Sequence, residues 1–215
     1  MTGNRSRVWN FPNLLTFTRV ILAIVMFIVI PFEHYWTALI LFLIAAATDW
    51  LDGWWARKFN QVSQLGRIMD PLADKIIVCG AFIYLVAIPD LQSIHLSIPY
   101  LEKVNFGLAP WMVVVIVLRE LLVTVLRSFV ENSGGNFSAK WIGKWKMGLQ
   151  CVAVPACFLY LIYLPKWGKE NMPGWLTVTL VVSICITVFL TLYSGIKYTV
   201  AAIQFGSMTE SDQQK

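Results

Sequence analysis

Charged side chains are scarce in this sequence. Its 215 residues include 17 Lys and Arg and 12 Asp and Glu, so that 13% of the chain is charged and 58% is apolar. A soluble globular domain has roughly a quarter of its residues charged, about twice this share. With a mean hydropathy of +0.66, the chain has more apolar surface than one small core can bury. The composition therefore excludes a soluble enzyme, a disordered chain and a collagen-like fibre.

Cysteine patterns and a cleavable signal are also missing. The four cysteines lie within apolar stretches, with neither a CxxC motif nor the spacing of a metal site, at Cys79, Cys151, Cys157 and Cys185. Isolated cysteines in such positions behave as small apolar residues. No small-residue cleavage site follows the first apolar run, which carries Arg19. We therefore expect that run to be a retained membrane span rather than a secretion signal.

Long apolar runs are what the sequence has in abundance. A membrane-spanning helix needs about 20 mostly apolar residues. The runs predict six helices, at residues 12–31, 35–57, 70–89, 110–130, 147–165 and 174–203. The predicted fold is all-α, a polytopic integral membrane protein with six transmembrane helices and a short N-terminal juxtamembrane segment. We expect residues 1–205 to form a single membrane domain and residues 206–215 to form a polar, mobile tail.

Basic residues predict the orientation of these helices. Six spans place both termini and the loops near 58–69 and 131–146 on one side, and the loops near 31–34, 90–109 and 166–173 on the other. Most of the basic loop residues belong to the first group, so this side should face the cytoplasm. The net charge of +5 then reflects topology and lipid headgroups, and no nucleic-acid partner is predicted.

Four aspartates flank the first cytoplasmic loop. Asp49 and Asp52 are spaced i, i+3 at the end of the second apolar run, and Asp70 and Asp74 are spaced i, i+4 at the start of the third. On helices each pair projects from a single face, and the two faces can meet across neighbouring helices. One or two such aspartates would be read as solvated or capping residues. Four in paired registers favour a binding site, because clustered carboxylates repel one another unless cations neutralise them.

The residue types around these aspartates indicate the ligand. Oxygen ligands without His or Cys favour Mg²⁺ or Mn²⁺ over zinc. Two such ions about 4 Å apart can clamp the attacking and leaving oxygens of a phosphoryl displacement. Gly53, Ala56 and Gly66 let a ligand approach the backbone closely, and Arg57 offers a planar fork for phosphate. The cluster therefore predicts a phosphate-bearing substrate.

The segment from Asp49 to Asp74 reads D-x2-D-G-x2-A-R-x8-G-x3-D-x3-D and resembles the signature of the CDP-alcohol phosphatidyltransferase family. The resemblance implies a six-helix, dimeric membrane enzyme that transfers a phosphatidyl or related group from a CDP-linked donor to an alcohol and releases CMP. It implies two Mg²⁺ or Mn²⁺ ions near Asp74. Asp74 itself would act as the general base. The implied metal ligands are Asp49, Asp52, Asp70 and Asp74. The implied CDP-binding residues are Asp52, Gly53, Ala56, Arg57 and Gly66.

Charges outside the signature indicate the acceptor. Arg119 lies about 13 Å along its helix from Pro110, near mid-membrane, where ionisable side chains usually face an interior cavity and mark a substrate path. An ion pair with Glu120 is disfavoured, because successive helical residues point about 100° apart. Three further cations could join Arg119 in binding a phosphorylated acceptor, Arg127, Lys144 and Lys146. For these three, ordinary flanking charge is the alternative.

Further segments are similar to bacterial family members that use sn-glycerol 3-phosphate as the acceptor. They are Pro12–Thr16 before Arg19, Leu118–Arg127, and Trp141–Lys146 followed by Gln150. This similarity implies transfer from CDP-diacylglycerol to sn-glycerol 3-phosphate by a homodimer in the bacterial cytoplasmic (inner) membrane, with its active site and both termini cytoplasmic. Phosphatidylglycerol and inositol phosphate are alternative acceptors. A prenyltransferase and an ion-coupled transporter are disfavoured, because the aspartates form one compact motif and the sequence contains no inverted repeat.

Overall fold

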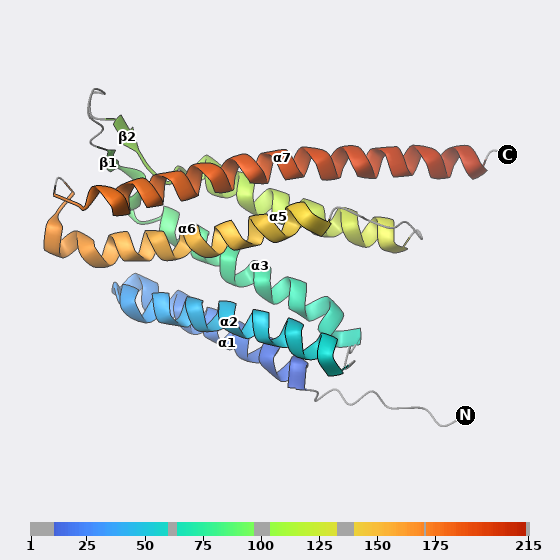
Figure 1. The fold of residues 1–215 in the computed structure, drawn as a ribbon, viewed down its shortest axis with the longest axis horizontal. Coiled ribbons are helices and arrows are strands. Elements are labelled where there is room, and N and C mark those ends of the chain that lie inside the picture. Colours follow the sequence, from blue (N-terminus) through green and yellow to red (C-terminus); the bar gives the residue numbers. More distant parts are fainter. Residues whose placement is uncertain (1–10, 60–63, 97–103, 133–139, 170, 214–215) are drawn as a thin grey trace.

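Six long helices make up most of the part of the chain that the structure describes (Figure 1). The computed structural model describes residues 11–59, 64–96, 104–132, 140–169 and 171–213. The long helices are α1 (Phe11–Val29), α2 (Tyr35–Phe59), α3 (Gln64–Val86), α5 (Pro110–Asn132), α6 (Lys140–Trp167) and α7 (Gly174–Gln213). Each overlaps one predicted span, so the predicted all-α fold class is confirmed.

The helices extend beyond the apolar runs that predicted them. α3 begins at Gln64 instead of residue 70, α6 begins at Lys140 instead of residue 147, and α7 continues to Gln213 instead of ending at residue 203. Hydropathy locates the apolar part of a helix, whereas backbone hydrogen bonding continues through polar residues such as Gln, Lys and Glu that form helices well. Most of the predicted polar tail therefore continues α7.

Short elements fill the connections at one end of the bundle, and the sequence did not predict them. A 3₁₀-helix, η1 (Ile30–Phe32), follows α1 and is followed by Glu33 in a left-handed conformation. Helix α4 (Pro89–Gln92) precedes an antiparallel hairpin of β1 (Ile94–Leu96) and β2 (Val104–Phe106). The all-α fold class holds with this short hairpin added, whose three-residue strands are too short to give an alternating hydrophobic pattern.

Gly107 anchors the hairpin against α4. A Cβ atom at this position would lie 2.1 Å from the carbonyl oxygen of Gln92, so only glycine lets the two backbones come this close. The next residue, Leu108, donates its backbone N–H to the carbonyl oxygen of Leu91 at 2.7 Å. Leu91, Ile94 and Leu108 are all buried, so the connection is part of the packed structure.

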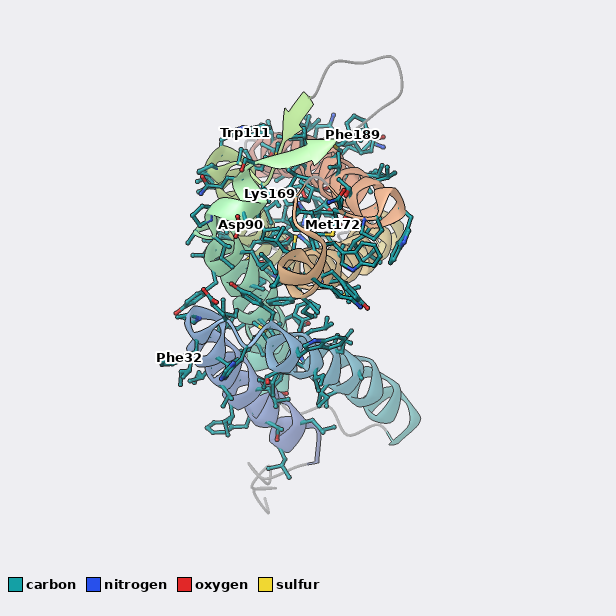
Figure 2. All side chains as sticks on the ribbon, turned by 90° about the vertical axis from the view of Figure 1, so that its left-hand side faces the viewer. Phe32, Asp90, Trp111, Lys169, Met172 and Phe189 are labelled. Carbon is teal, nitrogen blue, oxygen red and sulfur yellow. The ribbon has the colours of Figure 1, made fainter. Side chains whose placement is uncertain are left out.

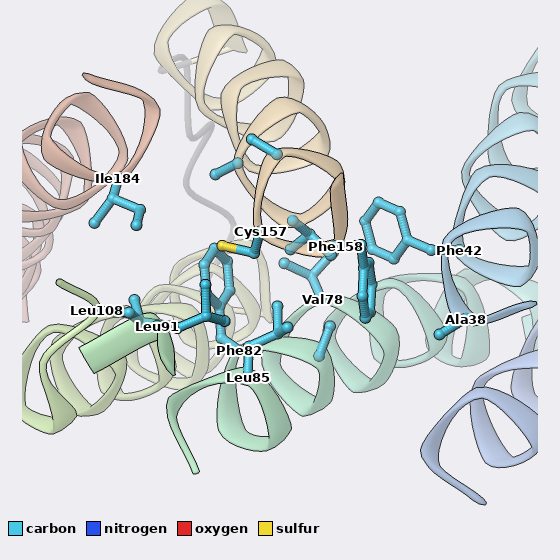
Figure 3. Packing of buried hydrophobic residues seen from close by; sticks show 14 of the residues in the cluster. Ala38, Phe42, Val78, Phe82, Leu85, Leu91, Leu108, Cys157, Phe158 and Ile184 are labelled. Atoms are coloured by element: carbon cyan, nitrogen blue, oxygen red, sulfur yellow. The ribbon is translucent and has the colours of Figure 1, made fainter. Parts of the chain in front are cut away.

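Helix α3 connects two groups of helices. α1 packs against α2 and α3, α5 packs against α3 and α7, and α6 packs against α2, α3 and α7. In Figures 1 and 2, α1 and α2 lie together on one side, α5 and α7 lie on the other, and α3 crosses between them. Figure 3 shows the shared core, with Phe42 of α2, Phe82 of α3 and Phe158 of α6 among its buried side chains.

Three helical stretches in the described part of the chain are long and apolar enough to cross a membrane. They are Leu14–Phe32, Gln150–Trp167 and Gly174–Gln204, and Tyr35–Thr48 forms a shorter apolar helix. These stretches support a multi-pass membrane protein. These stretches do not by themselves give the predicted six spans, because side chains are described for only part of α2, α3 and α5.

The connections between the long helices gather at two ends of the bundle. Figure 1 places the start of α1, the end of α2, the start of α3 and the end of α7 toward one end. It places η1, the β1–β2 hairpin and the turn between α6 and α7 at the opposite end. The signature of aspartates therefore lies toward the end that contains the last turns of α7.

Candidate active site

The aspartate signature occupies the end of α2 and the start of α3. α2 is helical through Asp49 and Arg57, and α3 is helical through Gly66 and Asp74. The predicted spacings therefore fall on continuous helices, which places each aspartate pair along one helix face. Seven signature residues have side chains outside the described part of the chain, Asp49, Asp52, Gly53, Ala56, Arg57, Gly66 and Asp70. Their roles remain predictions.

The buried face of α2 leads to the first aspartate pair. Ala38, Phe42 and Ala45 are buried, and they recur at the helical spacing of four and three residues. The next two positions of this register are Asp49 and Asp52. Asp49 and Asp52 thus share the register of these buried residues along the helix.

The buried face of α3 leads to the second aspartate pair in the same way. Ala81 and Ile77 are buried, and continuing the register toward the start of the helix gives Asp74 and then Asp70. α1 and α6 each pack against both α2 and α3. The helices that carry the two pairs are therefore held by the same two neighbours.

Asp74 is the signature aspartate whose side chain the structure describes. Arg19 Nη1, on α1, donates a hydrogen bond to Asp74 Oδ1 at 2.5 Å within an ion pair. The Arg19 side chain is 1% exposed and the Asp74 side chain is 20% exposed. The predicted general base thus contacts a buried cation from another helix, a contact that the sequence analysis did not predict.

Arg19 belongs to the packed face of α1. The buried residues of this helix follow helical spacing and include Thr16, Arg19, Ala23 and Met26. Such a stripe is the core-facing side of a helix. The guanidinium therefore takes a position where the same helix otherwise turns apolar side chains or a hydroxyl inward.

The donor chemistry of the signature fits hard divalent cations. The four predicted carboxylates would supply oxygen ligands, which Mg²⁺ and Mn²⁺ prefer. Among the side chains that the structure describes, no group of three or more His, Cys, Asp or Glu could hold a metal ion. The side chains of Asp49, Asp52 and Asp70 are not among those described, so the fit rests on the helical registers and on Asp74.

A second polar cluster lies where α5, α6 and α7 meet. Arg119 Nη1 is 3.3 Å from Glu120 Oε1, and Gln150 Nε2 donates a hydrogen bond to the same oxygen at 3.3 Å. The ring centroid of Tyr198 lies 5.5 Å from Arg119 Cζ. A Cβ atom at Gly195 would lie 3.2 Å from Arg119 Cγ, so the missing side chain lets α7 approach Arg119 closely.

The expectation that Arg119 would not pair with Glu120 is wrong. Their side chains are 10% and 14% exposed and form an ion pair. Successive Cβ atoms do point about 100° apart, but both side chains are long enough to bend into the same space between helices. Gln150 on α6 holds the Glu120 carboxylate there. The interior position predicted for Arg119 is nevertheless what the structure shows.

The other predicted acceptor-binding cations lie on the same helices as this cluster. Arg127 is on α5, two turns beyond Arg119. Lys144 and Lys146 were predicted to precede a helix, but they lie within α6, because α6 begins at Lys140. The side chains of these three residues are outside the described part of the chain. Their binding of a phosphorylated acceptor remains a prediction.

Several contacts in the two clusters were not predicted from the sequence. The partner of Arg19 was not predicted, although ionisable residues inside apolar spans usually have a partner and a role. Gly195 and Tyr198 lie inside a long apolar run of α7, where spacing alone does not distinguish them from neighbours that face lipid. Only the approach of α7 to α5 identifies them.

Comparison with known proteins agrees with the signature. The family model for CDP-alcohol phosphatidyltransferase matches residues 9–189. The chain is similar to proteins named CDP-diacylglycerol–glycerol-3-phosphate 3-phosphatidyltransferase in several bacteria. The identity to the Bacillus subtilis (strain 168) protein is 34% over 210 residues, covering 89% of this chain and 94% of the relative. The Haemophilus influenzae protein is 29% identical over 196 residues, covering 88% and 91%, and the Cereibacter sphaeroides protein is 31% identical over 173 residues, covering 77% and 68%.

Proposed function

We propose that this chain, which belongs to the CDP-alcohol phosphatidyltransferase family, is a phosphatidylglycerophosphate synthase. It transfers the phosphatidyl group of CDP-diacylglycerol to sn-glycerol 3-phosphate, releases CMP and so serves phospholipid biosynthesis. The observation that carries this conclusion is the similarity over 89% of the chain, and over 94% of the relative, to a protein named for that reaction. The aspartate signature on continuous helices supports the same chemistry.

The proposal includes two divalent ions, Mg²⁺ or Mn²⁺, at the signature. Asp49, Asp52, Asp70 and Asp74 would hold them. When bound, the ions supply positive charge that stabilises the donor pyrophosphate and the leaving CMP. The oxygen-only donor set and the two helical registers support this assignment.

Other signature residues would bind the donor, and Asp74 would act as the general base. Arg57 would bind the donor phosphates through its planar guanidinium, and Gly53, Ala56 and Gly66 would leave space for the CDP moiety. The acceptor hydroxyl oxygen forms a bond to the β-phosphorus of the donor. The bond from that phosphorus to the CMP oxygen breaks, and its electron pair leaves with CMP. Asp74 would take the proton of the attacking hydroxyl.

The membrane arrangement is part of the proposal. Each long helix has at least 19 residues, so α2, α3 and α5, with 25, 23 and 23 residues, exceed the length of about 20 that a bilayer requires. Six spans would place both termini and the active site on the cytoplasmic side of the bacterial inner membrane, as the basic loops favour. The protein would act as a homodimer, with the acyl chains of its donor remaining among the membrane lipids.

An acceptor panel tests the proposed function. Purified protein with CDP-diacylglycerol and Mg²⁺ or Mn²⁺ is expected to release CMP when sn-glycerol 3-phosphate is added, because the predicted cations match a phosphorylated acceptor. CMP release and the lipid product would be measured together. Product formation from phosphatidylglycerol or inositol phosphate, with none from sn-glycerol 3-phosphate, would contradict the acceptor assignment and retain the family reaction.

Arg119→Met is expected to raise the KM for sn-glycerol 3-phosphate by about 10- to 100-fold, because a hydrogen bond to a charged group contributes about 1.5–3 kcal/mol. The KM for CDP-diacylglycerol should stay within about threefold of the wild-type value. Initial rates of CMP release over a range of each substrate would measure both constants. Lys169→Met is a matched control, because it removes an ion pair with Asp90 outside the two clusters. Equal changes in both KM values would contradict the assigned role of Arg119.

A further inference from the structure

Arg19 differs from the other ion-paired cations that the structure describes in how completely it is buried. Its side chain is 1% exposed, against 10% for Arg119 and 30% for Lys169. Lys169 pairs with Asp90 at the opposite end of the bundle, where Figure 2 shows both residues. A buried ion pair must overcome the cost of removing two charges from water. The desolvation cost is therefore higher for the Arg19–Asp74 pair than for the Lys169–Asp90 pair.

Packing alone does not require a cation at this position. The face of α1 that carries Arg19 continues with buried Ala23 and Met26, and an apolar side chain would extend it. Replacing a buried ion pair by well-packed apolar residues is often neutral or stabilising. The ion pair with Asp74 gives the guanidinium a role at this position that an apolar side chain could not fill.

The contact constrains the carboxylate that the reaction would use. Arg19 Nη1 donates to Asp74 Oδ1, and α1, which carries the donor, packs against both α2 and α3. A planar guanidinium with a defined hydrogen-bond direction limits the rotation of the aspartate side chain. Misplacing a reacting group by about 1 Å can lower a rate by about 10²-fold, so a constraint of this kind has a kinetic consequence.

We propose that Arg19 is a positioning residue that orients the Asp74 carboxylate for proton transfer from the acceptor hydroxyl. This inference rests on the proposed function, because it takes Asp74 as the base of that reaction. Arg19 itself would contact neither the donor nor the acceptor. Its loss should therefore change kcat and leave the KM of both substrates near their wild-type values.

Arg19→Met and Arg19→Lys in the full-length protein test this proposal. Methionine preserves much of the side-chain volume and removes the charge, whereas lysine preserves the charge and removes the planar fork. Arg19→Met is expected to lower kcat for CMP release by about 10²-fold, and Arg19→Lys should recover part of the loss. Both KM values should stay within about threefold of wild type. Lys169→Met, which removes the Asp90 pair, should retain wild-type kcat.

Thermal unfolding in detergent separates positioning from loss of structure. Rates would be expressed per folded protein. If Arg19→Met does not fold, the kinetics of Arg19→Lys alone test the positioning role. A kcat loss of about tenfold or more in folded Arg19→Lys, at unchanged KM, supports the proposal. Wild-type kcat in the folded variants, or a rise in either KM at unchanged kcat, overturns it.

The wild-type assay distinguishes failure of this inference from failure of the proposed function. If the wild-type protein releases CMP with an acceptor other than sn-glycerol 3-phosphate, the variants would be compared with that acceptor. The proposal for Arg19 then stands or falls on its own kcat values. If the wild-type protein releases no CMP with any acceptor of the panel, both proposals are overturned.

Discussion

Asp74→Asn is expected to lower the rate of CMP release by about 10²- to 10⁴-fold, the contribution of a positioned general base. Asparagine has nearly the same shape as aspartate but cannot accept the hydroxyl proton. The rate would be measured with saturating CDP-diacylglycerol, sn-glycerol 3-phosphate and Mg²⁺. Wild-type activity in a folded Asp74→Asn protein would contradict the assignment of the base.

The structure adds a stability effect to this experiment. Because Arg19 is 1% exposed and pairs with Asp74, the substitution removes an anion beside a buried guanidinium. Breaking a buried ion pair costs up to about 3–5 kcal/mol, so thermal unfolding must accompany the assay. The double variant Arg19→Met/Asp74→Asn should be more stable than Asp74→Asn and equally inactive. This pair of results would separate lost chemistry from lost structure.

Removal of divalent ions is expected to abolish CMP release. A Lewis acid at a phosphoryl group contributes several kcal/mol to transition-state stabilisation, which corresponds to roughly 10³-fold in rate. Dialysis against a chelator, followed by titration with Mg²⁺ or Mn²⁺, would measure the loss and its recovery. Activity that persists at the wild-type rate after chelation would contradict the proposed metal site.

Two aspartate substitutions locate the metal requirement within the chain. Asp52→Asn should raise the Mg²⁺ concentration for half-maximal activity and lower the maximal rate, because it removes one predicted ligand. Asp90→Asn is the matched control, since Asp90 pairs with Lys169 at the other end of the bundle. Equal metal dependence in Asp52→Asn and the wild-type protein would place the ions elsewhere.

The helices were predictable because their apolar parts are long. All six predicted runs overlap observed helices, and the largest errors are at the polar ends, such as Lys140 of α6 and Gln213 of α7. Those ends depend on backbone hydrogen bonding, which hydropathy does not report. The hairpin of β1 and β2 was missed, because three-residue strands are too short to give an alternating hydrophobic pattern.

The candidate site was predictable to the extent that one continuous motif carries it. The spacing of Asp70 and Asp74 needs only a helix to place both on one face, and α3 provides that helix. The partner of Asp74 was not predictable, because Arg19 is distant in sequence and reaches it only through the packing of α1 on α3. The pairing of Arg119 with Glu120 was predicted wrongly, because the directions of the Cα–Cβ bonds do not fix the positions of the charged groups of two long side chains.

By itself, the sequence determined that this is a helical membrane protein with a clustered carboxylate signature, because hydropathy and helical spacing are local properties. Only the tertiary structure decided that Arg19 of α1 contacts Asp74 of α3, and that Gly195 and Tyr198 of α7 lie against Arg119 of α5. These contacts join residues far apart in the chain, so they depend on which helix faces pack together. Burying a charged side chain inside an apolar bundle has a high free-energy cost, and such packing lowers this cost by bringing an oppositely charged partner to it.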